Sequence, residues 1–321
     1  MSKEKYQGIF PAFYACYDDN GEVSPSRTQD LARYFVSKGV KGVYVCGSSG
    51  ECIYLSKEDR KIMLENVMEV VKGKLTVIAH VACNNTRDSM ELAAHAESLG
   101  VDAIAAIPPI YFHLPEYSIA DYWNSISSAA PNTDFVIYNI PQLAGTALTP
   151  SLLKEMLKNP KVAGVKNSSM PVQDIEIFKS IGGDRLTVFN GPDEQLISGR
   201  VMGADGGIGG TYGAMPELIL KADQLVRENK LDEARPIQYA INAIISKLCA
   251  GHCNMYAMIK EVLRIRESLD IGGVRAPLTN LTEADKPIAK EAADMIQAAI
   301  DKYCYLESND AQVRKKYYHT Y

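Results

Sequence analysis

The sequence predicts an α/β protein that folds as a (β/α)8 barrel with a C-terminal extension of three helices. Short runs of β-branched or apolar residues alternate with longer segments of helical spacing, and eight such pairs follow one another. The runs recur about every 30 residues, which is the length of a unit in which a helix connects two parallel strands. The 321 residues are sufficient for one barrel of about 250 residues and an extension.

The strand candidates share a short length and a β-branched or apolar composition. They are residues 8–14, 42–46, 75–81, 102–107, 135–138, 162–166, 186–190 and 205–209. Parallel strands with right-handed crossovers close most economically into a barrel of the TIM type, whose active site lies on the loops after the carboxyl ends of the strands. We therefore expect the functional residues at those ends.

The helix candidates begin at residues that favour helix starts. Pro25 and Pro150 follow cap-type residues, and a proline is tolerated in the first turn of a helix. Ser56 and Asp59 resemble a capping box. The clearest helical segments between the strands are residues 25–37, 56–71, 87–99, 116–129 and 150–157. Three more follow the last strand without a strand between them, at 231–248, 255–266 and 283–303.

We expect three regions along the chain. Residues 1–228 form the barrel, which is the catalytic domain, and residues 229–304 form a C-terminal helical region. Residues 305–321 are polar and have no apolar face, so we expect a flexible tail there.

Composition excludes several classes of function. The chain has 34 Lys and Arg against 39 Asp and Glu, a net charge of −5, so there is no net positive field to hold a phosphate backbone and we expect no nucleic-acid partner. No apolar run approaches the roughly 20 residues of a membrane span, and the first residues are charged, so we expect a cytoplasmic protein without a membrane partner. The seven cysteines lack paired spacing, which predicts reduced thiols.

Lys166 ends a predicted strand at the functional face of the barrel. Period-2 alternation places Lys166, Gly164 and Val162 on one face of the strand, with Ala163 and Val165 on the other. If Lys166 points inward, burial lowers the pKa of its amine, and a neutral amine can attack a carbonyl carbon to form a Schiff base. The alternative is a lysine that reaches water or pairs with a carboxylate.

Tyr138 ends the preceding predicted strand. Neighbouring strands lie roughly 4.8 Å apart, so the Tyr138 hydroxyl and the Lys166 amine can meet above the barrel. A phenol beside an imine nitrogen can hold a substrate carboxylate or transfer a proton during bond cleavage. The alternative is a tyrosine that merely packs at the rim of the barrel.

Two other loops carry polar groups suited to a ligand. Residues 47–51 combine glycines, which let backbone amides approach a ligand, with the hydroxyl donors of Ser48 and Ser49, and this combination suits a carboxylate. After the seventh strand, Asp193 and Glu194 can accept hydrogen bonds from the hydroxyls of a sugar. The alternatives are a plain helix-capping turn for the first loop and acids favoured by a helix dipole for the second.

The loop after the eighth strand, residues 207–213, is rich in glycine and predicts close approach to an anionic or polar group. It lacks the following helix and acid of a dinucleotide-binding fingerprint. Farther along, Cys249, His252 and Cys253 can share one face of a helix, but a fourth zinc ligand at the usual spacing is missing. We expect ordinary packing there and no metal.

Taken together, four motifs resemble the pyruvate-dependent lyase family that includes N-acetylneuraminate lyase and dihydrodipicolinate synthase. They are residues 47–51, 138–141, 164–166 and 206–209, and the resemblance spans about residues 8–303. It implies a homotetrameric (β/α)8 barrel with a helical C-terminal domain. It also implies no metal and no cofactor, because the covalent intermediate is a Schiff base between the protein and its substrate.

Within this family the sequence resembles the sialic acid lyases more than the synthases. Gln142 and Leu143 stand after Pro141, where the synthases usually carry an arginine that clamps a carboxylate. Tyr44 and the acids at 193 and 194 instead resemble the lyases, whose acids contact the glycerol chain of the sugar. The resemblance therefore implies cleavage of N-acetylneuraminate, a keto-acid sugar, to N-acetylmannosamine and pyruvate.

The resemblance also implies a role for each site residue. Lys166 forms the imine, Tyr138 assists proton transfer, and Ser48 acts with Ser49 on the pyruvyl carboxylate. Tyr111 matches a tyrosine that can reach toward the site of the neighbouring subunit. The expected substrate-binding residues are Ser48, Ser49, Ser168, Gly191, Asp193, Glu194, Gly209 and Gly210. Ser168 and Gly210 stand where the lyases often have Thr and Ser, and Ser49 stands where Thr is usual, so some contacts with the substrate differ.

Three alternatives remain open from the sequence. The first is a related aldolase that acts on a 2-keto-3-deoxy sugar acid with the same lysine, and the second is a dihydrodipicolinate synthase. The third is a non-catalytic binding or regulatory barrel, but such a protein has no reason to place an amine beside Tyr138 in the interior.

Overall fold

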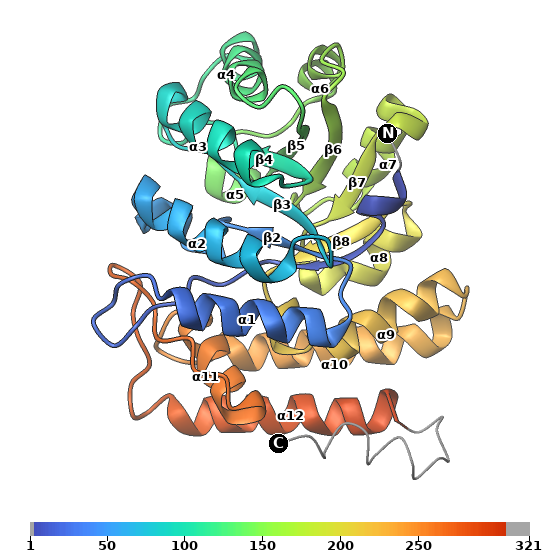
Figure 1. Cartoon of the computed structure of the whole chain (residues 1–321). Coiled ribbons are helices and arrows are strands. Elements are labelled where there is room, and N and C mark those ends of the chain that lie inside the picture. The colour runs from blue at the N-terminus through green and yellow to red at the C-terminus, as the bar shows by residue number, and fades with distance from the viewer. Residues whose placement is uncertain (1–2, 306–321) are drawn as a thin grey trace.

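The computed structural model describes residues 3–305 and has a (β/α)8 barrel at its centre (Figure 1). The strands are β1 (Gly8–Pro11), β2 (Gly42–Val45), β3 (Thr76–His80), β4 (Ala103–Ala106), β5 (Asp134–Asn139), β6 (Val162–Asn167), β7 (Thr187–Asn190) and β8 (Gly206–Gly209). All pair in parallel, in the order β1-β8-β7-β6-β5-β4-β3-β2. A parallel bridge from Ala12 to Tyr44 joins the two ends of this order, and the sheet therefore closes on itself. The predicted fold class is confirmed.

The helices surround the strands in the order that the sequence predicts (Figure 1). Around the barrel they are α1 (Pro25–Lys38), α2 (Lys57–Val71), α3 (Thr86–Leu99), α4 (Glu116–Ser128), α5 (Pro141–Ala144), α6 (Pro150–Met156), α7 (Gln173–Gly182), α8 (Leu196–Val201) and α9 (Pro216–Arg227). Ser56 and Asp59 make both hydrogen bonds of a capping box at the start of α2, as the sequence predicts. No helix within residues 3–305 is long and apolar enough to cross a membrane.

The inside of the barrel is a packed apolar core. Side chains from β1, β3, β5, β7 and β8 meet there, including Phe10, Ile78, Val136, Phe189 and Ile208. A short 3-10 helix, η1 (Lys3–Tyr6), covers the amino-terminal end of the strands, where the Tyr6 hydroxyl donates a 2.7 Å hydrogen bond to Asp134. Because this end of the barrel is filled, a substrate has to enter from the carboxyl end of the strands.

The alternation expected along β6 is interrupted near its start. Phe135 of β5 lies opposite Val162, but the next residue, Val136, lies opposite Gly164, so Ala163 is an extra residue in the strand. As a result Ala163 packs in the interior and Val162 in the outer cluster, which corrects the expected assignment of these two side chains. The bulge leaves the end of the strand unaffected, and Lys166 still points inward.

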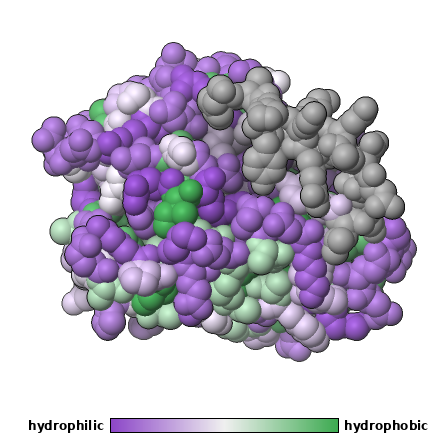
Figure 2. All heavy atoms as spheres, turned by 90° about the horizontal axis from the view of Figure 1, so that it is seen from below, coloured by the Kyte–Doolittle hydropathy of each residue, from purple (hydrophilic) through white to green (hydrophobic). Residues whose placement is uncertain are grey.

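Three helices form the predicted C-terminal extension, and they lie on one side of the barrel (Figure 1). They are α10 (Leu231–Leu248), α11 (Met255–Glu267) and α12 (Lys286–Tyr303). Figure 2 shows the face of the molecule on this side, which is mostly hydrophilic with smaller hydrophobic areas. The division of the chain at residue 228 stays a prediction. Of the predicted tail at 305–321, all but Tyr305 lies outside the described residues.

A buried ion pair ties the extension to the barrel. Lys260 of α11 lies 2.9 Å from Glu51, which follows β2, and their side chains are 2% and 0% exposed. The Tyr17 hydroxyl and the backbone N–H of Arg275 each donate a 2.9 Å hydrogen bond to the other carboxylate oxygen of Glu51. Burying these charges is costly, but each is paired and hydrogen-bonded, so the arrangement is specific.

Replacing Lys260 with Met should destabilise the fold by about 3–5 kcal/mol, because Glu51 would be left as a buried charge without its partner. Denaturant unfolding monitored by circular dichroism measures this loss. Lys290→Met is the matched control, since Lys290 forms an exposed pair with Asp294 on α12 and its loss should cost less than about 1 kcal/mol. Equal effects of the two substitutions would contradict the structural importance of the buried pair.

Candidate active site

Lys166 is buried at the carboxyl end of β6 between two aromatic rings. Its Nζ atom lies 3.9 Å from the ring centroid of Tyr138 and 4.3 Å from that of Tyr44. Burial lowers the pKa of the Lys166 amine to about 7, and the carboxylate of Asp193 acts in the opposite direction. A large fraction of this amine is therefore neutral near pH 7, which is the form that attacks a carbonyl carbon.

Tyr138 lies beside Lys166 in the neighbouring strand, and the register pairs these two residues directly. Burial raises the pKa of the Tyr138 phenol to about 12, while the side chains of Ser48 and Ser168 lower it. The phenol is therefore protonated at neutral pH and can both donate and accept a hydrogen bond. The structure thus brings Lys166, Tyr138, Ser48 and Ser168 together.

One further residue, His80, extends the aromatic wall around the amine. The ring of His80, at the end of β3, lies 6.0 Å from the ring of Tyr138 and 6.2 Å from that of Tyr44. His80 Nδ1 donates to the carbonyl oxygen of Cys46 at 3.0 Å, and burial holds its pKa well below the usual value, so the ring is neutral. Sequence reasoning missed His80, although a polar residue at the end of a predicted strand was a usable signal.

The Gly/Ser loop, residues 47–51, lies against Tyr44. A Cβ atom at Gly47 would come within 2.6 Å of the Tyr44 ring, so only glycine lets the backbone pass there. Ser48 is half-buried and Ser49 is buried, and both hydroxyls follow the end of β2. Glu51, in contrast, points away into its ion pair with the extension.

Gly191 lets the ends of β6 and β7 come close together. A Cβ atom at Gly191 would lie 2.0 Å from Ser168 Oγ, so any larger residue would displace the serine that faces Tyr138. Beneath them, the side-chain amide of Asn139 donates a 2.7 Å hydrogen bond to the side-chain oxygen of Asn167. Paired and buried, these amides fix the ends of the strands that carry Tyr138 and Lys166.

The adjacent acids after β7 lie in different environments. Asp193 begins a short 3-10 helix, η4 (Asp193–Gln195), and its Oδ2 accepts hydrogen bonds from the backbone N–H and the hydroxyl of Thr211, both at 2.6 Å. Burial raises the pKa of Asp193 to about 6, and the bonds from Thr211 oppose this shift. Its other oxygen lies 2.2 Å from the position that a Cβ atom of Gly209 would take. Glu194, by contrast, is exposed.

Tyr111 is exposed at the surface, whereas Lys166 is buried. Tyr111 lies between β4 and α4, is 87% exposed and has a positive φ of 82°. Its ring packs edge-on against Phe112, which is also exposed. Gln142, in contrast, donates a 2.9 Å hydrogen bond to the backbone oxygen of Ser168 and therefore supports the site from α5.

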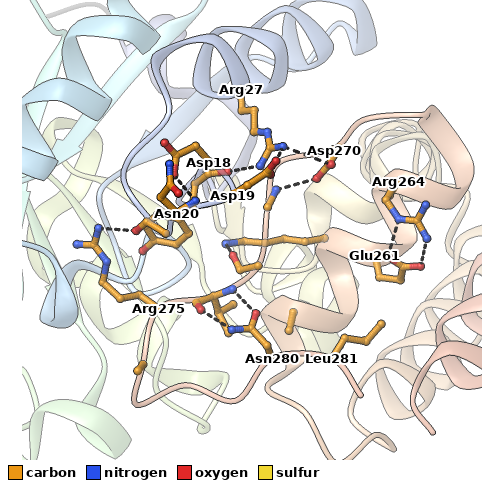
Figure 3. A pocket seen from close by; sticks show the side chains of 18 residues that line it. Asp18, Asp19, Asn20, Arg27, Glu261, Arg264, Asp270, Arg275, Asn280 and Leu281 are labelled. Carbon is orange, nitrogen blue, oxygen red and sulfur yellow. Dashed lines mark hydrogen bonds and ion pairs between the residues drawn. The ribbon is translucent and has the colours of Figure 1, made fainter. Parts of the chain in front are cut away.

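A separate cavity of about 650 Å³ lies between the β1–α1 loop and the extension (Figure 3). Its basic side chains all have acidic partners: Arg27 lies 2.7 Å from Asp19 and Arg264 pairs with Glu261 within the cavity lining, while Lys260 and Arg275 pair with Glu51 and Asp59 beyond it. None of the predicted site residues lines it. Its internal charges are therefore already satisfied, and it is distinct from the site around Lys166.

The cysteine and histidine cluster after α10 has no metal-binding geometry. Cys249 and His252 are exposed, and the sulfur of Cys249 contacts that of Met255. Within residues 3–305, no group of three His, Cys, Asp or Glu side chains is arranged to hold a metal ion.

The chain resembles known proteins over most of its length. A model of the dihydrodipicolinate synthetase family matches residues 5–298. The N-acetylneuraminate lyase of Mediterraneibacter gnavus is 69% identical over 300 residues, covering 94% of this chain and 95% of that protein. The N-acetylneuraminate lyase of Salmonella agona is 32% identical over 290 residues, covering 90% and 97%.

A solved structure is similar in both fold and sequence. It is described as a catalytic lysine mutant of the sialic acid aldolase of Ruminococcus gnavus, and it has a TM-score of 0.93 and 68% identity over 94% of this chain and 99% of that one. Such extensive matches agree with the strand-end motifs of the sequence, and we conclude that the chain belongs to the dihydrodipicolinate synthetase family.

Proposed function

We propose that this protein is a Schiff-base aldolase that cleaves N-acetylneuraminate to N-acetylmannosamine and pyruvate. The observation that carries the proposal is the buried amine of Lys166, whose pKa is lowered to about 7 beside the Tyr138 phenol. The similar proteins from M. gnavus and R. gnavus, named as a lyase and an aldolase of sialic acid, support the choice of substrate.

The reaction begins when the neutral amine of Lys166 attacks the ketone carbon of the open-chain substrate. The carbonyl oxygen leaves as water, and the nitrogen and carbon become joined as a protonated imine. Ser48 holds the neighbouring carboxylate with its hydroxyl, and Ser49 holds it with its backbone N–H, since the Ser49 hydroxyl donates to Tyr256. The aromatic walls of Tyr44 and Tyr138 face the cation that develops on the nitrogen.

In the next step the carbon–carbon bond breaks, and its electrons move toward the imine. Tyr138 accepts or relays the proton of the substrate hydroxyl whose carbon becomes the aldehyde, and the bond electrons flow into the cationic imine. N-acetylmannosamine leaves, and the lysine retains pyruvate as an enamine. Protonation of the enamine carbon and addition of water to the imine release pyruvate and restore the amine.

Residues of the neighbouring loops bind the sugar part of the substrate in this proposal. Ser168, Asp193 and Glu194 accept or donate hydrogen bonds to its hydroxyls, while Gly191, Gly209 and Gly210 allow close approach. Asp193 keeps its Oδ1 for this role, since its Oδ2 is engaged by Thr211. No metal and no further cofactor takes part, because the imine itself withdraws the electrons.

We further propose that the protein is a homotetramer in which Tyr111 reaches the site of a neighbouring subunit. Its 87% exposure and its left-handed backbone at the rim of the barrel support this role, because a strained, exposed aromatic gains little within one chain. A cytoplasmic location is consistent with the seven free cysteines.

Reduction with borohydride in the presence of pyruvate should attach a three-carbon adduct to Lys166, because the imine becomes a stable secondary amine. Peptide mass mapping locates the adduct. Lys166→Ala should abolish it, whereas Lys161→Ala, at the opposite end of the same strand, should retain it. An adduct on another lysine, or none in the unaltered protein, would refute the proposed chemistry.

The rate of adduct formation with pyruvate and cyanoborohydride should fall about tenfold per pH unit below pH 7, because only the neutral amine of Lys166 reacts. Asp193→Asn removes a negative charge that raises the pKa of Lys166. The acid limb of the profile, which is the pH range in which the rate of adduct formation falls, should therefore move to lower pH. Asp301→Asn, on the exposed side of α12, should leave the profile unchanged. A shift of the Asp193→Asn limb to higher pH would contradict the electrostatic assignment.

Glu194→Gln tests the substrate assignment without disturbing the buried Asp193. Cleavage of N-acetylneuraminate should lose about tenfold or more in kcat/KM, as expected when a hydrogen bond to a charged group is lost, while the pyruvate adduct still forms. Glu283→Gln, an exposed acid remote from Lys166, serves as the control. If Glu194→Gln cleaves sialic acid normally, a related keto-acid aldolase becomes the better assignment.

A further inference from the structure

Tyr256 reaches the Gly/Ser loop from the C-terminal extension. It lies in the first turn of α11, where the side chain of Asn254 caps the helix by accepting a 2.9 Å hydrogen bond from the Tyr256 backbone N–H. The Tyr256 ring lies 6.3 Å from that of Tyr14, whose hydroxyl donates to the backbone oxygen of Gly210 at 2.8 Å. Helix cap and ring contact together fix the direction of the Tyr256 side chain.

The Tyr256 hydroxyl has an unused proton. Ser49 Oγ donates to the Tyr256 oxygen at 3.1 Å, so the phenol acts as the acceptor in this contact. Within residues 3–305, no protein group accepts the proton of Tyr256 itself. Its side chain is half-buried, so it lies at the wall of the site rather than inside the core. A donor in this setting is available to a bound molecule.

The position of this hydroxyl indicates which part of a substrate it faces. A Cβ atom at Gly210 would lie 3.5 Å from the Tyr256 oxygen and 3.2 Å from Ser49 Oγ, so the phenol borders the space left open by that glycine. Burial raises the pKa of the Tyr256 phenol, and Tyr138 and Asp193 add smaller effects in the same direction. The phenol therefore stays protonated and keeps its donor proton.

We propose that Tyr256 is a substrate-binding residue that donates a hydrogen bond to a hydroxyl of the polyol part of the substrate, in the space in front of Gly210. The inference rests on the function proposed above and extends it, because a residue of the helical extension then selects keto acids that carry a polyol chain. Pyruvate, which has no such chain, does not use this contact.

Tyr256→Phe is the test, with two readouts from the same preparation. The KM for N-acetylneuraminate should rise about 3- to 10-fold, as expected for the loss of one neutral hydrogen bond. The concentration of pyruvate that gives half-maximal borohydride trapping on Lys166 should stay unchanged. A rise in both values would overturn the proposal by placing Tyr256 at the carboxylate end, and no change in either would overturn it as well.

Tyr34→Phe is the matched control. The Tyr34 hydroxyl of α1 donates internally to Gly213 at 3.0 Å, so its loss should lower Tm and leave both readouts unchanged. Because the hydroxyl proton of Tyr256 has no internal acceptor in residues 3–305, Tyr256→Phe should change Tm less than Tyr34→Phe does. If the KM rises as much in Tyr34→Phe as in Tyr256→Phe, the effect of the Tyr256 substitution is structural and the proposal is wrong.

Gly210→Ser provides a rescue experiment. In the Tyr256→Phe background a serine hydroxyl can replace the lost donor in the same space, so the KM for N-acetylneuraminate should return toward the original value. In the unaltered background the serine is crowded by Ser49 at 3.2 Å and should bring no gain. Absence of rescue in a folded double variant contradicts the proposal. Failure of the proposed function itself is distinguishable, since no pyruvate adduct would then form even in the unaltered protein.

Discussion

The site depends on the burial of one amine against aromatic faces. Lys166 lies between the rings of Tyr138 and Tyr44 in an interior that solvates its ammonium form poorly, and the opposing influence of Asp193 is not strong enough to restore the usual pKa. The surrounding architecture maintains this balance. The packed barrel interior excludes water from below, and the buried amides of Asn139 and Asn167 hold the two strand ends in register.

Glycines place the polar groups around this amine by letting backbone and side chains approach more closely than other residues permit. Gly47 makes room for Tyr44, Gly191 for Ser168, and Gly209 for Asp193. In each case a Cβ atom would overlap the functional side chain itself. The glycine-rich composition of the loops therefore serves the placement of neighbouring side chains as much as the approach of a ligand.

The order of the strands was predictable from the sequence because short apolar runs recur at regular intervals, with segments of helical spacing between them. The strand-end rule also located Lys166 and Tyr138, since a parallel barrel brings consecutive strand ends together. The bulge at Ala163 was not predictable, because one extra residue leaves no mark in an apolar run. Tyr256 escaped detection for another reason: it is distant in sequence and enters the site only through the docking of α11.

The pairing of Glu51 with Lys260 makes the helical extension part of the support of the Gly/Ser loop. Glu51 ends the loop whose two serines face the active site, and the groups that satisfy its charge come from beyond the barrel. A barrel cut off before the extension would therefore keep the carboxylate of Glu51 but lose the ammonium and the backbone N–H that satisfy it.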